Sequence, residues 1–407
     1  MPGQPDDDKT SSLEQPTSTV TRRKWLQTAS VGFTSAILAV AGVSADETSP
    51  ISEGRSRSAV VGGNQSQNEE SEDETDDNDS SDGSDNLTLG GGEDYENIVD
   101  ADDADYIVSG QDELAGALID AGSGEIVFID PDVSFEMGNT SLDIPEGVTV
   151  ASNRGEDGSD GALIETTRGN EPGELFTMHA ESRITGIRMR GPWPEGPNGS
   201  TNSNAVTAVS EGIEIDNCEI GQFSYAGVNL NNGEAHVHHN HIYEINQSGL
   251  GYGVTMSTGR PLIEYNYFDY NRHSIASTGS HEGYVCQYNH FGPNATDIVI
   301  DIHEPAGRNS EVHNNIVEAN EQIGGDYTPL PALQVRGVPD DVYEITENWF
   351  FNQQEPLDSP AGSWTNESII QPTETAWRNV EFSDNYYGES ADVDYDDIIP
   401  GYDGSWS

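Results

Sequence analysis

Residues 260–304, RPLIEYNYFDYNRHSIASTGSHEGYVCQYNHFGPNATDIVIDIHE, contain two copies of one short pattern. IEYNYF (263–268) and CQYNHF (286–291) each place an apolar residue three positions before an asparagine and another two positions after it. Six turns between residues 237 and 387 share this pattern, centred on Asn240, Asn266, Asn289, Asn315, Asn348 and Asn385. An earlier turn, IEIDNCEI (213–220), carries Asn217 one residue out of register.

Successive asparagines of this series are 23, 26, 23, 26, 33 and 37 residues apart. Short strands repeated at this period, with no helix in each repeat and no leucine pattern, predict an all-β solenoid rather than leucine-rich repeats. β-Propeller blades are longer. We therefore expect a right-handed single-stranded parallel β-helix. Its core would be the inward Val/Ile/Phe column, and its turns would use asparagine, which tolerates left-handed backbone and can bond along the stack.

The ends of a solenoid expose strand edges and need caps. Residues 111–121 place Leu114, Ala117, Leu118 and Ala121 on one helical face, which predicts an N-terminal capping helix. The stretch after Asn385 is expected to cover the other end, and its aspartates are either solvated surface or a calcium site. The predicted division is a signal peptide (1–45), an acidic disordered linker (46–95), the β-helix (96–390) and an acidic tail or cap (391–407).

The composition is strongly acidic. There are 73 acidic against 16 basic residues, a formal net charge of −57, and the two lysines are Lys9 and Lys24. Many hydrated carboxylates are typical of a halophile surface, where concentrated salt screens their repulsion. A calcium-loaded acidic surface is the alternative. In either case the charge excludes nucleic acid as a partner, because its phosphates would be repelled. Within the linker, ten of the seventeen residues 69–85 are acidic and none is apolar, so this segment cannot bury a core.

The N-terminus indicates export. TRRKWL (21–26) resembles a twin-arginine signal, residues 25–43 form a moderately apolar run, and the small residues 43–45 suit cleavage. The alternative is a membrane anchor, but the run contains several polar residues and is a poor span. We expect a secreted or cell-surface protein, monomeric, with no stable membrane span after cleavage. The two cysteines, Cys218 and Cys286, are too few for a disulfide framework, and Cys286 is expected in the core.

Residues from about 105 to 388 resemble the pectin-lyase-like superfamily of right-handed parallel β-helix proteins, as a haloarchaeal-type member exported by the twin-arginine route. The resemblance rests on QDELAGALIDA (111–121), EIVFID (125–130), IPEGVTVASNRG (144–155) and the asparagine turns. It implies an acidic or neutral polysaccharide laid along a groove of the helix. The fold carries lyases, hydrolases, epimerases and adhesins. Neither the arginine pattern of pectate lyases nor the aspartate set of polygalacturonases is visible, so no catalytic residue can be transferred.

Nine of the ten histidines lie between residues 236 and 313, and several of them accompany arginine or aspartate. Removing the C5 proton of a uronate needs a base and a group that neutralises charge on the adjacent carboxylate. Alternation along VIDIHE puts Asp301 and His303 on one face, opposite Ile300 and Ile302, and predicts that both polar groups point to solvent. The hypothesis is that His273 or His303 is the base and that Asp301 orients a histidine.

The remaining candidate residues complete this patch. Arg272 and Arg336 would grip the substrate carboxylate, and His281 would lie beside them. The predicted substrate-binding residues are Arg336, Arg260, Tyr252 and Tyr284. Asp301 with His273, His281 and His303 could instead bind a divalent ion, but the spacing matches no known motif, so no metal site is predicted. The cofactor is unknown, with Ca²⁺ left open as a charge neutraliser. The cluster HVHHNH (236–241) is expected to be surface decoration.

The sequence therefore favours a secreted carbohydrate-active enzyme, a polysaccharide lyase that cleaves an acidic polysaccharide by β-elimination. One alternative is a glycoside hydrolase that uses Asp301 with Glu304 or Glu282. The other is a non-catalytic cell-surface or adhesion protein. The identity of the polymer does not follow from the sequence.

Overall fold

The structure is a computed structural model that describes residues 21–22, 89–167, 173–193, 202–232, 234–280, 282–318, 321–322, 330–360 and 365–405. Most of the predicted signal peptide and of the acidic linker lies outside the described residues, as does His281. Among the described residues, no helix is both long and apolar enough to cross a membrane.

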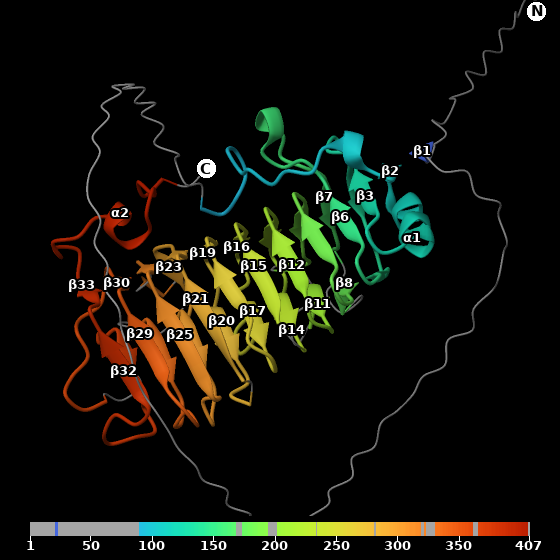
Figure 1. Ribbon diagram of the computed structural model, residues 1–407. Helices are drawn as coiled ribbons and strands as arrows, with labels where there is room; N and C mark the ends of the chain where they lie inside the picture. The colour runs from blue at the N-terminus through green and yellow to red at the C-terminus, as the bar shows by residue number, and fades with distance from the viewer. Residues whose placement is uncertain are drawn as a thin grey trace, which may run out of the picture. The chain divides into compact units, whose positions relative to one another are not determined.

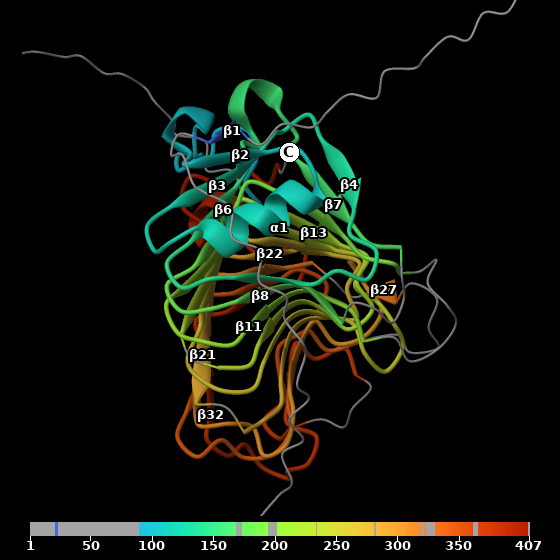
Figure 2. The same cartoon turned by 90° about the vertical axis from the view of Figure 1, so that its right-hand side faces the viewer.

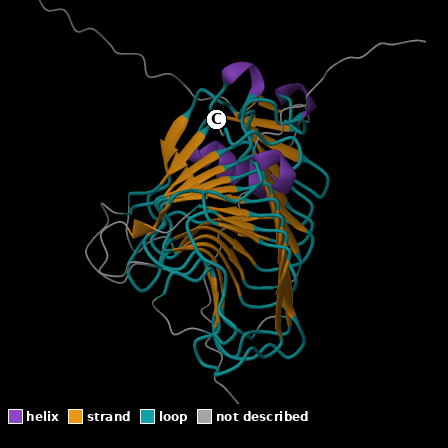
Figure 3. Ribbon diagram, turned by 90° about the vertical axis from the view of Figure 1, so that its left-hand side faces the viewer, coloured by secondary structure: helices purple, strands orange, loops and turns teal. Residues whose placement is uncertain are grey.

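The chain winds through three long sheets, here called A, B and C, and returns to each once per coil (Figure 1). From β2 onward, each strand of these sheets pairs in parallel with the equivalent strand of the preceding and the following coil, whereas β1 pairs antiparallel with β2. This arrangement is a parallel β-helix, as the repeat predicts, and short strands stacked around it account for most of the described elements (Figure 3).

Sheet A contains β1 (Thr21–Arg22), β2 (Tyr106–Val108), β3 (Ile126–Ile129), β6 (Thr149–Ala151), β9 (Arg183–Thr185), β12 (Ile213–Asp216), β15 (Ala235–His238), β18 (Leu262–Glu264), β21 (Gly283–Gln287), β25 (Asn309–His313), β29 (Tyr343–Thr346) and β32 (Val380–Ser383). Sheet B contains β4 (Ser134–Glu136), β7 (Leu163–Glu165), β10 (Arg188–Arg190), β13 (Glu219–Gly221), β16 (His241–Tyr243), β19 (Tyr267–Asp269), β22 (His290–Phe291), β26 (Ile316–Val317), β30 (Trp349–Phe350) and β33 (Tyr386–Tyr387). Sheet C contains β5 (Leu142–Ile144), β8 (Glu174–Met178), β11 (Asn204–Ala208), β14 (Ala226–Leu230), β17 (Tyr252–Met256), β20 (His273–Ser277), β24 (Ile300–Ile302), β28 (Leu333–Val335) and β31 (Ile369–Ile370). Outside these sheets are β23 (Asn294–Ala295), which pairs with β27 (Glu321–Gln322), the helices α1 (Gln111–Asp120) and α2 (Tyr395–Ile398), and the 3₁₀ turns Ala101–Asp103 and Glu156–Gly158.

The core is the inward column that the repeat predicts. On sheet A the register aligns Val237, Ile263, Cys286, Val312 and Ile345, all of which are buried. Equivalent columns line the inner faces of sheets B and C, so the apolar side chains stack from coil to coil. Cys286 takes the place of a β-branched residue in this column, which confirms the expected role of its side chain.

The recurring asparagines form a ladder at the turn between sheets A and B. The side-chain amide of Asn240 donates to Oδ1 of Asn266 over 3.0 Å, and the same bond links each later asparagine to the next, as far as Asn385. The left-handed backbone lies one residue earlier than expected, at His239 (φ 52°) and Tyr265 (φ 54°) in these coils. The role of asparagine in these turns is therefore its side-chain amide, which satisfies buried backbone groups of adjacent coils. Its tolerance of left-handed backbone is not used.

The ladder also explains the register shift of the first turn. The backbone N–H of Cys218 donates to Oδ1 of Asn240 over 3.0 Å, so Cys218 occupies the ladder position of its coil. Asn217 takes the left-handed position (φ 52°), and its Oδ1 accepts from the backbone N–H of Gly92 over 2.7 Å. Packing consequently begins before the expected boundary at residue 96, since Leu89 is fully buried.

A helix covers the N-terminal end of the solenoid, whereas the C-terminal segment packs on its side. Helix α1 buries Leu114, Ala117 and Leu118 against β2, β3 and β5 across the N-terminal end, as predicted (Figure 2). The C-terminal segment was expected to cover the last coil. Instead Ile398, Ile399 and Tyr402 pack with Leu89 and Trp349 against the side of sheet B. The segment therefore covers outer apolar side chains of the strands just before the last one, such as Trp349 on β30 and Ile316 on β26.

A candidate active site on sheet C

The sequence-predicted residues meet on the outer face of sheet C, where β20, β24 and β28 are adjacent strands. The register places Ala276, Asp301 and Gln334 side by side on successive coils. Ile300 and Ile302 are fully buried in the core, as the alternation predicts, so Asp301 faces outward between them. Strand stacking thus brings His273, Asp301 and Arg336 together from three successive coils.

Asp301 faces outward but is only 1% exposed, so the expectation that it points into solvent is wrong. Arg336 clamps the carboxylate with two groups: Nε donates to Oδ1 over 3.0 Å, and Nη2 contacts Oδ2. The amide of Gln334 donates to Oδ1 over 3.2 Å. Burial alone would raise the pKa of Asp301, but the contact with His303 and the charges of His273 and Arg336 outweigh it and lower that pKa to about 2. Asp301 is therefore a fixed negative charge beneath the surface.

His303 is the accessible histidine of the group, with 34% of its side chain exposed. Its Nε2 lies 3.1 Å from Oδ2 of Asp301. Because an ionised carboxylate only accepts, the tautomer that fits this contact carries its proton on Nε2 and leaves the lone pair on Nδ1. Gly279 lies directly against the same loop: with φ at 76°, an added Cβ would come within 2.1 Å of the His303 carbonyl oxygen. A glycine is thus required where the neighbouring coil passes His303.

His273, the other candidate base, is fully buried. Its Nδ1–H donates to the carbonyl oxygen of Ile298 over 2.5 Å, its Nε2 lies 3.4 Å from Asp301 Oδ2, and its ring stacks on Tyr252 with centroids 5.8 Å apart. Burial lowers the pKa of His273, while the charge of Asp301 acts in the opposite direction. A side chain covered in this way cannot reach a polymer on the surface, so His273 supports Asp301 and Tyr252.

Arg272 lies beside this group but is held by another carboxylate. Its Nη2 pairs with Asp297 Oδ2 over 3.0 Å, and its guanidinium carbon lies 6.0 Å from the ring centroid of Tyr252. Tyr225 meets Tyr252 edge-on, with centroids 5.4 Å apart. These contacts extend the cluster toward the N-terminal coils. Tyr252 is itself buried, so it backs the partly exposed ring of Tyr225, which is the aromatic side chain of this pair that a sugar ring could reach.

Two other predicted residues, Arg260 and Tyr284, do not join the cluster. Arg260 forms an ion pair with Glu311 of β25, which places it on the sheet A side. Tyr284 is buried in the core with its hydroxyl against that of Tyr343, and burial raises its pKa well above the usual value. Tyr284 is thus a core residue that no surface polymer contacts. His281 lies outside the described residues.

The sequence reasoning missed Asp297 and Gln334. Gln334 has a detectable signal, because in LQV (333–335) it alternates with two apolar residues as Asp301 does in IDI (300–302). Asp297 precedes its strand by three residues and carries no such pattern. Its role depends on where Arg272 of the preceding coil lies, which is a tertiary contact.

Two groups among the described residues have metal-ligand geometry. In the first, donor atoms of His273, Asp301 and His303 lie within 4.8 Å of one another. There Arg336 already supplies a positive charge to the same carboxylate, which disfavours a cation. The second group, on sheet A, comprises Glu214, His236 and His238.

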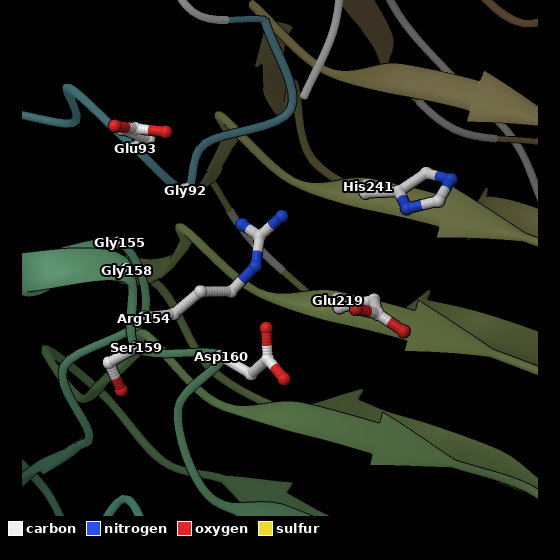
Figure 4. Close-up of a pocket in the computed structure, with 9 residues that line it drawn as sticks. All are labelled: Gly92, Glu93, Arg154, Gly155, Gly158, Ser159, Asp160, Glu219 and His241. Atoms are coloured by element: carbon white, nitrogen blue, oxygen red, sulfur yellow. The ribbon is translucent and has the colours of Figure 1, made fainter.

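A cavity of about 390 Å³ lies elsewhere, beside sheet B (Figure 4). It is lined by Gly92, Glu93, Arg154, Gly155, Gly158, Ser159, Asp160, Glu219 and His241. The buried Arg154 donates to the Gly90 carbonyl oxygen over 2.9 Å and so anchors the N-terminal segment to the coils. Burial, with the charge of Arg154, lowers the pKa of His241 to about 3. A neutral histidine and three carboxylates around one structural arginine are poorly suited to an anionic polymer or to acid–base chemistry at neutral pH.

Comparisons with known proteins support the fold. No family model and no curated protein matches the sequence. Among solved structures, the chain is similar to the crystal structure of an alginate lyase from Paenibacillus sp. str. FPU-7, with a TM-score of 0.51 and 14% sequence identity. The match covers 69% of this chain and 94% of that chain. At this identity the likeness concerns the fold, and it agrees with the three parallel sheets described above.

Proposed function

We propose that this protein is a polysaccharide lyase that cleaves a uronate-containing polymer by β-elimination on the outer face of sheet C. The observation that carries the proposal is the partly exposed imidazole of His303, whose Nε2 lies 3.1 Å from the buried and ionised carboxylate of Asp301, next to Arg336. A base, its orienting group and a cation within one cluster are the parts that this reaction needs.

In the proposed reaction, Nδ1 of His303 takes the proton from C5 of the uronate. The electron pair of the broken C5–H bond forms the C4–C5 double bond, and the C4–O4 bond breaks. The departing O4 recovers a proton from the imidazolium, so that His303 returns to its starting state. Asp301 holds the imidazole in the required tautomer and stabilises its charged form.

Arg336 is the group that would neutralise the substrate carboxylate. Nε and Nη2 contact Asp301, while further N–H groups of the guanidinium remain available, and 36% of the side chain is exposed. Negative charge builds on the uronate carboxylate as C5 loses its proton, and a guanidinium stabilises this charge bidentately. Tyr225, backed by the buried ring of Tyr252, would support the adjoining sugar ring.

The structural neighbour is named an alginate lyase, which makes alginate the first polymer to test. The acidity of the chain and its twin-arginine-like segment support an exported enzyme that works in concentrated salt. A glycoside hydrolase is less well supported. With a pKa of about 2, Asp301 cannot act as a general acid at neutral pH, and Glu282 is exposed and pairs with Arg308.

The test is an ultraviolet assay in concentrated NaCl with alginate, pectate and glucuronan, run with Ca²⁺ and with a chelator. The proposal expects absorbance from an unsaturated uronate, which persists without Ca²⁺ because Arg336 supplies the cation. New reducing ends without this absorbance would indicate a hydrolase. Binding without any cleavage would indicate a surface protein.

A further inference from the structure

Sheet A carries a second histidine–carboxylate cluster, which the proposed reaction does not use. Its members are Glu214 on β12, His236 and His238 on β15, and Glu264 on β18. In the strand register, Glu214 lies beside His236, and His238 lies beside Glu264. The side-chain contacts are the opposite ones, because each histidine reaches the glutamate beside the other histidine. Nε2 of His236 lies 2.9 Å from Glu264, and Nε2 of His238 lies 3.1 Å from Glu214.

We propose that this cluster binds one divalent transition-metal ion of the Zn²⁺ class. One donor atom each of His236, His238 and Glu214 already lies within 4.8 Å of the other two. Because bonds from these atoms to Zn²⁺ are about 2.0–2.2 Å long, small side-chain rotations suffice to close the site. Two imidazoles with carboxylate select this class of ion, since Ca²⁺ and Mg²⁺ prefer all-oxygen ligands. Glu264 would be a fourth ligand or an acceptor at its edge.

The residues behind the cluster hold these ligands in place. Nδ1 of His238 lies 2.9 Å from Nδ1 of His239, so the ring has a partner on the side away from the site. The amide of Gln287 donates to the second oxygen of Glu264. The ring centroids of His236 and His238 are 3.9 Å apart, so the two rings pack against each other beside the site. Such outer partners are typical of metal sites, where they fix the ring orientation.

Access and charge also favour an ion. The side chain of His236 is 39% exposed, so an ion can enter from solvent, whereas His238 is covered. Arg183 pairs with Asp216 over 2.6 Å and also with Glu214, over 3.6 Å to the oxygen that faces away from His238, so the oxygen toward the histidines stays open to an ion. A bound ion would join β12 and β15, two successive coils, and β18 as well if Glu264 ligates. The ion would therefore act as a cross-link of the solenoid.

The test is a titration of the untagged, metal-stripped full-length protein with Co²⁺, read by visible absorption and by calorimetry. We expect one equivalent to bind, with the intense band of a four- or five-coordinate ion, and Zn²⁺ to displace it. The variant His236→Gln should bind at least tenfold more weakly. His179→Gln is the matched control, because His179 is an exposed histidine that pairs with a single carboxylate, Asp143, over 3.1 Å. It should bind as the unmodified protein does.

Two further variants make the result decisive. Glu214→Gln removes an exposed ligand with little risk to folding and should weaken binding as His236→Gln does. His303→Gln should leave Co²⁺ binding unchanged. Loss of the band in His303→Gln with retention in His236→Gln would place the ion on sheet C and overturn the proposal. Weak binding of several equivalents that no variant alters would mean adsorption to the acidic surface and would overturn it as well.

Discussion

The outer faces of sheets C and A each carry two histidines next to carboxylates, but the two clusters differ in what holds the carboxylate. On sheet C, Asp301 is buried and clamped by Arg336, so its charge is already balanced. On sheet A, Glu214 is 41% exposed: one of its oxygens faces His238, and the other lies 3.6 Å from Arg183, which pairs more closely with Asp216. The same residue types thus suit different tasks: a balanced buried carboxylate orients an imidazole for proton transfer, whereas converging imidazole and carboxylate donors that solvent reaches through His236 and Glu214 suit a cation.

The largest expected difference between the two clusters is in catalysis. Replacing His303 by Gln removes the proposed base and should lower kcat/KM by about 10³-fold, within the usual range for general base catalysis. His236→Gln on sheet A should leave the rate unchanged. Both are measured by the ultraviolet assay, with circular dichroism to verify folding. A loss of activity in His236→Gln equal to that in His303→Gln would contradict the assignment of catalysis to the sheet C cluster alone.

A smaller effect is expected for the charge neutraliser. Arg336→Gln should reduce kcat about 10²-fold, because it removes a cation that acts on charge developed in the transition state. Arg336→Lys should recover part of this loss, since lysine keeps the charge but not the bidentate geometry. Steady-state kinetics with both variants provide the check. An increase in KM alone, with kcat unchanged, would assign Arg336 to ground-state binding only.

Removing the carboxylate of each cluster should also lower the stability of the fold by different amounts. Asp301→Asn leaves Arg336 without its ionic partner beneath the surface and should lower the free energy of unfolding by about 2–3 kcal/mol. Glu214→Gln, at an exposed position, should cost less than about 1 kcal/mol in metal-free protein. Denaturant unfolding at constant salt measures both. Equal losses in the two variants would contradict the burial that distinguishes Asp301.

The smallest predicted effect is a dependence of the free energy of unfolding on pH below pH 4. The folded state lowers the pKa of Asp301 from 3.8 to about 2, so its ionised form stabilises the fold above the unfolded pKa. This contribution, roughly 2 kcal/mol from a shift of about two pH units, is lost as pH falls through the folded value. The free-energy difference between the unmodified protein and Asp301→Asn should shrink between pH 4 and pH 2. A difference that stays constant over this interval would contradict the assigned shift.

Much of this architecture is local and could be read from the sequence. The spacing of the asparagine turns predicts coils, alternation along VIDIHE predicts which isoleucines face inward, and the 111–121 pattern predicts the helix that covers the first coil. These features follow from backbone geometry within a few residues. They require no knowledge of which coil lies beside which.

The chemistry of the site depends on contacts between stacked coils, which set the burial and charge of its residues. Asp301 was expected in solvent, but Arg336 and Gln334 of the next coil cover it, and His273 of the preceding coil lies beneath. Tyr284 and Arg260 looked equally suitable in the sequence, yet one packs in the core and the other pairs across sheet A. The period, the inward column and the candidate residue types follow from the sequence. Which of these residues meet depends on how the coils stack, because loops of unequal length set the register between coils, and because burial, which controls charge and access, arises from neighbours far away in the chain.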